Sequence, residues 1–159
     1  MPRFITCAGG DKNSLKLGWL FLMTIPGAPC IYYGDEIGLD GRHDPECRKA
    51  FPWEEDKWDR DLLTYVKAAI ALRKEYPVLR RGDHQRLQAT DGIYCYSRSL
   101  EADRLLIVGI NTSESPQQFD VMYEAAQSPM PIFGSASELS VHEGRLKFTV
   151  PARSGVVLK

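Results

Sequence analysis

Apolar residues occupy nearly every position between residues 15 and 23. Such density predicts a helix that is buried on more than one side, because almost no polar face remains. Asn13 or Ser14 can cap its start, since a short side-chain oxygen accepts from an unpaired N–H of the first turn. A Pro-Gly pair at 26–27 ends it. The apolar members are Leu15, Leu17, Trp19, Leu20, Phe21, Leu22 and Met23.

A shorter apolar run, Cys30–Tyr33, follows Pro29 and does not alternate with polar residues. A run of this kind predicts a strand covered on both faces, as in a parallel sheet. Helix, tight turn and buried strand together form one step of an α/β fold. Neighbouring residues of a strand point to opposite faces, so we expect Tyr32 and Tyr33 to point apart.

Residues 34–58 show no period and carry many charges. A connection of this length without regular structure is usually a functional loop or a disordered linker. Its large apolar residues argue against disorder, because they can tuck under the loop. Core packing is the default expectation for both tryptophans, with stacking on a sugar ring as the alternative. The large apolar residues of this stretch are Ile37, Leu39, Phe51, Trp53 and Trp58.

Residues 59–76 give the clearest helical pattern. Asp59 and Asp61 suit the positive end of a helix dipole, and Pro77 stops the helix. One stripe at helical spacing predicts the packed face. Its members are Leu62, Leu63, Val66, Ala69, Ile70 and Arg73.

After Pro77 the pattern changes to short β-branched and aromatic runs divided by turn residues. This punctuation predicts an antiparallel β-sandwich. We place the boundary near residues 78–82, which gives an α/β domain over 1–79 and an all-β domain over 80–159. The predicted strands lie at 83–89, 92–99, 104–111, 117–122, 130–134, 139–143, 145–151 and 154–159.

Composition and charge exclude several classes of protein. The net charge of −1 gives no electrostatic reason to expect nucleic acid or an anionic membrane as a partner. The apolar run at 19–23 is too short to span a bilayer. The four cysteines stand far apart without a CxxC pair, so we expect free thiols and a cytoplasmic protein. No GxGxxG, P-loop or GxSxG motif is present, and no cofactor is expected.

Asp35 and Glu36 follow Gly34 at the end of the predicted strand, the end at which α/β folds place function. They could be a catalytic acid/base pair or substrate ligands. Alternatively, one carboxylate accepts backbone N–H groups and organises the loop. The structural role is favoured for Glu36, because adjacent side chains tend to point apart and a buried carboxylate needs donors.

The stretch HDPECR places Asp44 four residues before Arg48. A zinc site at His43 and Cys47 is disfavoured, because companion ligands at standard spacing are missing, and no metal is expected. A carboxylate and a guanidinium together can accept from and donate to vicinal hydroxyls of a sugar. They can equally form an exposed ion pair worth about 0–1 kcal/mol. The spacing leaves both interpretations open.

Three stretches resemble the α-amylase family of glycoside hydrolases. GAPCIYYGDEIGL is similar to the segment around that family's eighth barrel strand. HDPECRKAFPW is similar to the neopullulanase, cyclomaltodextrinase and maltogenic amylase branch, and LKFTVPARSGVVLK to the last strands of the terminal sandwich. The resemblance implies the end of a (β/α)8 TIM barrel, with helix seven, strand eight and helix eight, followed by an all-β sandwich.

The resemblance also implies a function. Family members hydrolyse α-glucans with three catalytic carboxylates, none of which matches a position here, since Met1 falls just after the third. We therefore expect no catalytic residue and no activity in this chain alone. Asp44 and Arg48 match residues that hold sugar units, and Gly34 and Glu36 match positions that shape the loop.

Two alternatives to an inactive segment of a hydrolase stay open: a non-catalytic carbohydrate-binding or assembly module, and a transglycosylase of the same family. The expected partner of the intact enzyme is an α-glucan oligosaccharide. A barrel strand without neighbours exposes its edges, so we also expect self-association through the barrel remnant.

Overall fold

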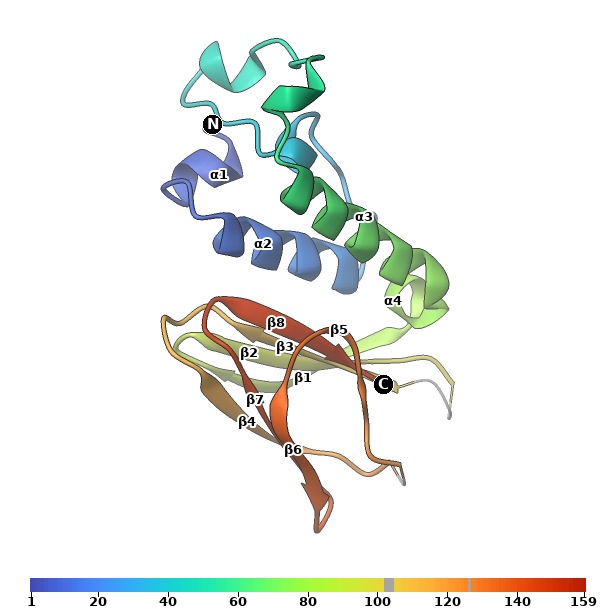
Figure 1. The fold of residues 1–159 in the computed structure, drawn as a ribbon. Coiled ribbons are helices and arrows are strands. Elements are labelled where there is room, and N and C mark those ends of the chain that lie inside the picture. The colour runs from blue at the N-terminus through green and yellow to red at the C-terminus, as the bar shows by residue number, and fades with distance from the viewer. Residues whose placement is uncertain (102–104, 126) are drawn as a thin grey trace.

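The computed structural model describes residues 1–101, 105–125 and 127–159. Its helices come first in the chain and lie over one face of a two-sheet β-sandwich (Figure 1). This arrangement agrees with the predicted order of a helical barrel remnant followed by an antiparallel sandwich. The helices are α1 (Phe4–Cys7), α2 (Lys12–Thr24), α3 (Arg60–Glu75) and α4 (Pro77–Arg81).

Helix α2 has the two buried sides that its sequence predicts. Leu15, Trp19 and Met23 pack with residues of α3, whereas Leu17 and Leu20 pack on the sandwich. The predicted cap is wrong by two or three residues. The N-cap is Asp11, which accepts from the backbone N–H groups of residues 13 and 14.

Helix α3 begins at Arg60 after the N-cap Asp59, which accepts from the Leu62 N–H at 3.0 Å. Leu62, Val66 and Ala69 of the predicted stripe are buried, whereas Leu63 and Ile70 are half-buried. Leu72, outside the predicted stripe, is also buried. Arg73, in the last turn, is also buried. Its guanidinium donates to the carbonyl oxygens of Met23 at 2.8 Å and Ile25 at 3.1 Å, and so caps the end of α2.

The predicted strand at residues 29–33 is not formed. Cys30–Tyr33 has no ladder partner among the described residues, and Ile31 and Tyr32 are more than two-fifths exposed. The apolar pattern was that of a strand held between two neighbours. A strand forms only when its N–H and C=O groups pair with those of a neighbouring strand. Among the described residues, no strand lies beside Cys30–Tyr33.

Every strand pair of the sandwich is antiparallel. One sheet has the order β1-β2-β3-β8-β5 and the other β4-β7-β6. All eight predicted runs form strands, although Arg104, at the start of one predicted run, lies outside the described residues. The strands are β1 (Asp83–Thr90), β2 (Ile93–Ser99), β3 (Leu105–Asn111), β4 (Gln117–Met122), β5 (Pro131–Gly134), β6 (Ser137–His142), β7 (Arg145–Val150) and β8 (Ser154–Leu158).

The larger sheet is apolar on both faces. One face packs on the smaller sheet, where the rings of Phe119 and Phe148 stack 4.8 Å apart. The other face lies under α2 (Figure 1). The approach is so close at Gly155 that a Cβ atom there would lie 2.6 Å from Leu20 Cδ2. No helix in the described ranges combines the length and hydropathy needed to cross a membrane.

Candidate functional site

The loop from Gly34 to Trp58 contains three short 3₁₀ turns: Asp35–Ile37, Glu46–Arg48 and Glu55–Lys57. Gly34 opens the first of these turns with a φ of 86°. A side chain at Gly34 would be strained, both by this φ and by Leu39, whose Cδ2 would lie 2.6 Å from the added Cβ. The loop packs on α3 through Ile37, which is buried.

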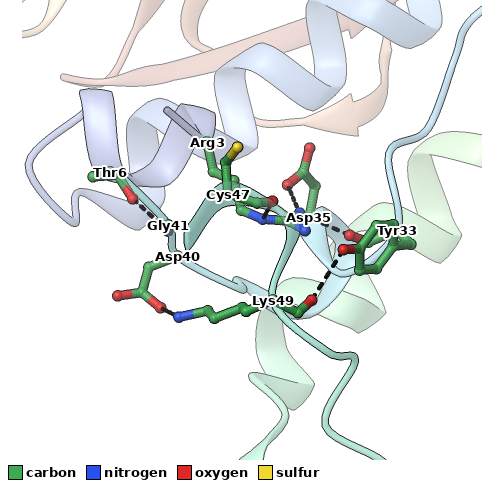
Figure 2. Close-up of polar contacts among 8 residues, drawn as sticks. All are labelled: Arg3, Thr6, Tyr33, Asp35, Asp40, Gly41, Cys47 and Lys49. Atoms are coloured by element: carbon green, nitrogen blue, oxygen red, sulfur yellow. Dashed lines mark hydrogen bonds and ion pairs between the residues drawn. The ribbon is translucent and has the colours of Figure 1, made fainter. Parts of the chain in front are cut away.

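The amino-terminal segment clamps this loop (Figure 2). The Arg3 guanidinium donates to the carbonyl oxygens of Tyr33 at 2.7 Å and Cys47 at 3.0 Å, and to the Asp35 carboxylate at 2.8 Å. The backbone of Arg3 adds a further contact with the loop, since its N–H donates to the Gly41 carbonyl oxygen at 2.9 Å. Arg3 is only 4% exposed, and its Nη2 has no hydrogen-bond acceptor among the described residues.

Tyr32 and Tyr33 do not point apart as the predicted strand required. Their ring centroids lie 4.7 Å from each other. The Arg3 guanidinium lies 4.7 Å from the Tyr32 centroid and 4.8 Å from the Tyr33 centroid, within the range of a cation–π contact. Without a strand to separate them, both rings gather on one buried cation.

Asp44 and Arg48 form the predicted planar pair. Arg48 donates from Nε and Nη2 to the two carboxylate oxygens of Asp44, each at 2.7 Å. Both side chains remain more than half exposed. Hydrogen bonding to Asp44 raises the pKa of Arg48. The pair, which we call the Asp44–Arg48 fork, therefore exposes charged hydrogen-bond donors and acceptors to the solvent.

This fork borders a surface hollow of about 490 Å³. The other side of the hollow is formed by the amino-terminal residues and by the start of the loop. The hollow has the mixed polar and aromatic lining that suits a hydroxyl-rich ligand. Besides the fork it is lined by Met1, Pro2, Arg3, Phe4, Tyr32, Asp35 and Cys47.

The two adjacent carboxylates have different surroundings. Asp35 binds Arg3, so the residue that organises the loop is Asp35, through a side-chain partner that sequence analysis did not identify. Glu36 Oε2 is buried and has no hydrogen-bond partner within the described parts of the chain. The contact with Arg3 supports a structural role for Asp35 rather than the role of a catalytic acid or base.

The tryptophans divide between packing and exposure. Trp58 is half-buried, and its Nε1 donates to the Pro52 carbonyl oxygen at 2.7 Å. Trp53 is 81% exposed, so core packing is the wrong interpretation for this residue. Its ring packs at 4.9 Å, edge to face, on Phe51. The chain that follows Trp53 directly is highly charged: Glu54, Glu55, Asp56 and Lys57 are all exposed.

A metal site has no support in the geometry. No group of three or more His, Cys, Asp or Glu side chains suited to a metal occurs within residues 1–101, 105–125 and 127–159.

The model of the α-amylase catalytic domain matches residues 1–82 of the chain. The chain belongs to the α-amylase family. A cyclomaltodextrinase of Geobacillus thermopakistaniensis is 45% identical over 133 residues, which are 82% of this chain and 21% of the relative. Neopullulanase 2 of Thermoactinomyces vulgaris is 33% identical over 98% of this chain and 27% of its own length. These relatives place the chain in the cyclomaltodextrinase, neopullulanase and maltogenic amylase branch.

A solved structure, the debranching enzyme of Nostoc punctiforme, superposes with a TM-score of 0.90 at 38% identity. The match covers 99% of this chain and 33% of that enzyme. The chain thus spans between a fifth and a third of the length of these three proteins.

The sequence predicted the Asp44–Arg48 pair, but it did not predict the contacts that Arg3 makes with the loop. Asp44 and Arg48 were visible because their spacing suits a bidentate pair. Arg3 gave no signal, because it lies 30 or more positions from each residue whose side chain or carbonyl it binds.

Proposed function

We propose that this chain is the carboxyl-terminal segment of an α-glucan-acting glycoside hydrolase and that its loop 34–58 forms part of the sugar cleft. The observation that carries the proposal is the exposed Asp44–Arg48 fork beside the hollow. Both partners can exchange their mutual hydrogen bonds for vicinal sugar hydroxyls, since a carboxylate accepts and a guanidinium donates in one plane. The names of the relatives, cyclomaltodextrinase and neopullulanase, support a glucan as the ligand.

The fork orients substrate rather than breaking bonds. Retaining glycosidases use one carboxylate as nucleophile and a second as acid and base. Asp44 and Arg48 would instead supply remote binding energy and orientation, which accelerate the reaction only together with those two groups. We propose that this chain alone does not hydrolyse glycosidic bonds, because the resemblance to the family assigns a catalytic position to none of its residues.

Calorimetric titration of the chain with maltoheptaose tests this proposal. We expect Asp44→Ala to weaken binding about tenfold, which corresponds to about 1.4 kcal/mol. The matched control is Glu55→Ala, which breaks the equally exposed Arg60–Glu55 pair at 2.8 Å and should leave the affinity unchanged. Equal affinity of the wild type and Asp44→Ala would refute sugar contact by the fork. Release of reducing sugar from β-cyclodextrin or pullulan would refute the lack of activity.

We also propose self-association of the chain through one apolar face. Exposed apolar side chains gather along the outer side of α2 and the segment before the loop. This α2–Tyr33 face comprises Phe4, Phe21, Ile31, Tyr32 and Tyr33, which are between 38% and 49% exposed. A contiguous face of this kind favours association. A cytoplasmic location is likewise a proposal, supported by the four unpaired cysteines.

A further inference from the structure

The segment that carries the fork has almost no apolar anchor. From residue 42 to residue 50 every residue is exposed except Cys47, which is half-buried. Apolar burial therefore contributes little to the position of Asp44 and Arg48. Polar contacts with the rest of the molecule must fix where the fork lies.

Five such contacts hold the segment and its immediate surroundings, and most of them start from the amino terminus (Figure 2). The backbone and Nε of Arg3 hold Gly41 and Cys47 through their carbonyl oxygens, and the Thr6 hydroxyl accepts from the Gly41 N–H at 2.9 Å. Farther along, Tyr33 Oη donates to the Lys49 carbonyl oxygen at 2.9 Å. Lys49 also pairs with Asp40.

Arg3 is the one buried side chain in this set. Its guanidinium binds the segment on one side through Cys47 and the start of the loop on the other side through Tyr33 and Asp35. Cys47 immediately precedes Arg48 in the same 3₁₀ turn. Fixing its carbonyl oxygen therefore fixes the backbone from which Arg48 extends.

The chemistry of this contact requires arginine. A guanidinium presents several N–H donors in one rigid plane, whereas the lysine ammonium is a point charge on a flexible stem. The flat group also packs against the rings of Tyr32 and Tyr33. These rings fix the plane of the guanidinium and so the directions in which it donates.

We propose that Arg3 is the positioning residue for the Asp44–Arg48 fork. This inference rests on the sugar-binding function proposed above, but the position of the fork can be measured without any sugar. The guanidinium holds the Cys47 carbonyl oxygen at a fixed place relative to Asp35 and so keeps Arg48 within reach of Asp44. Without the guanidinium, the exposed segment would move on the nanosecond timescale.

NMR relaxation of the sugar-free chain tests the inference with Arg3→Met, which keeps the apolar stem and removes the donors. We expect the backbone order parameter of Arg48 to fall from about 0.85 to below about 0.6, the range of a flexible loop. The order parameter of Val66 in α3 should not change. The matched control, Arg60→Met, removes an exposed arginine at the start of α3, directly after the loop, and should leave Arg48 rigid.

An unchanged order parameter at Arg48 in Arg3→Met would overturn the proposal. Equal loss of order at Arg48 and Val66 would also overturn it, because Arg3 would then support the whole fold. If Arg3→Met does not fold, Arg3→Lys provides the same test. Addition of methylguanidinium to Arg3→Ala should restore the rigidity of Arg48, which a general packing role would not allow.

Maltoheptaose binding separates this inference from the proposed function. We expect Arg3→Met to weaken binding about tenfold, as Asp44→Ala does. If Arg48 becomes flexible and not even the wild type binds the sugar, the positioning role stands and the sugar-binding function fails. If the wild type binds and Arg3→Met binds equally well with a rigid Arg48, the positioning role fails and the function stands.

Discussion

Arg98 of β2, which has no exposed surface, donates from Nη1 to the carbonyl oxygen of Leu79 in α4 at 3.0 Å. The same guanidinium reaches the carbonyl oxygens of Thr24, Gly82 and Asp83. Its hydrogen bonds in the described structure go to carbonyl oxygens only, and burial lowers its pKa. One side chain of the sandwich thus satisfies the ends of both α2 and α4.

We expect Arg98→Met to reduce the free energy of unfolding by about 3 kcal/mol. Methionine fills much of the space but leaves several buried carbonyl oxygens without donors, each at a cost of about 1–3 kcal/mol. Urea denaturation followed by tryptophan fluorescence measures the loss. Arg60→Met, which removes an exposed arginine, should change stability by less than about 0.5 kcal/mol. Comparable losses in the two variants would contradict the role of Arg98.

Asp11 should make the chain sensitive to acid. Hydrogen bonds from Ser14 and Arg153 lower the pKa of Asp11 to about 2 in the folded protein. The carboxylate therefore stabilises the fold fully above its ordinary pKa of 3.8 and loses this effect as the pH falls toward 2. Because the group is partly open to solvent, we expect a contribution of about 1 kcal/mol.

Asp11→Asn isolates this effect, because asparagine can still cap α2 but carries no charge. We expect the stability difference between wild type and variant to shrink by about 1 kcal/mol between pH 5 and pH 2, roughly the window in which the unfolded carboxyl becomes protonated. Urea denaturation at several pH values measures it. A difference that stays constant across this range would exclude the charge of Asp11 as its source.

Cys95 should resist thiol reagents while the protein is folded. Its side chain is fully buried, and burial raises its pKa to about 12 from 9.0. A shift of this size lowers the thiolate fraction at neutral pH by about a thousandfold. After a short pulse of N-ethylmaleimide, peptide mass spectrometry should find the exposed Cys7 and Cys30 modified and Cys95 unmodified. Labelling of Cys95 at the rate of Cys30 would show that the larger sheet opens frequently.

Self-association through the α2–Tyr33 face can be tested with one charge. Ile31 is 43% exposed and stands in the chain between Cys30 and Tyr32, both of which line an apolar hollow of about 360 Å³. We expect the wild type to elute as an oligomer and Ile31→Asp to shift toward monomer, because a charge opposes burial of this face. Size-exclusion chromatography with light scattering measures both. Met130→Asp, at a 71% exposed position of the sandwich, should still associate. A monomeric wild type would refute the proposal.

Local patterns predicted much of the fold. The α3 helix was visible because its acidic start, its stripe and the following proline all agree within 19 residues. The sandwich strands were visible because most of them are short runs with β-branched or aromatic residues, bounded by turn residues. The strand predicted at Cys30–Tyr33 was wrong for the opposite reason. An apolar run of this kind becomes a strand only beside neighbouring strands, and none pairs with it among the described residues.

The burial of Arg3 and Arg98 could not be predicted from the sequence, since arginine is mostly exposed in proteins. Arg73 fell on the predicted packed stripe of α3 and is buried there, but the carbonyl oxygens that it binds were not predicted. Each is buried because carbonyl oxygens from distant segments converge on it. Asp44 and Arg48, by contrast, are only four residues apart, so their pairing could be predicted from the sequence. The contacts of Arg3 that hold this segment could not.

Gly155 of β8 lies so close to Leu20 that α2 and the larger sheet pack as one unit. A protein trimmed near residue 80 would retain both sheets yet lay bare Tyr96, Val108 and Val157, which α2 now helps to cover. A laboratory that wants this β-sandwich as a small, soluble scaffold should therefore clone α2 and its neighbours with it.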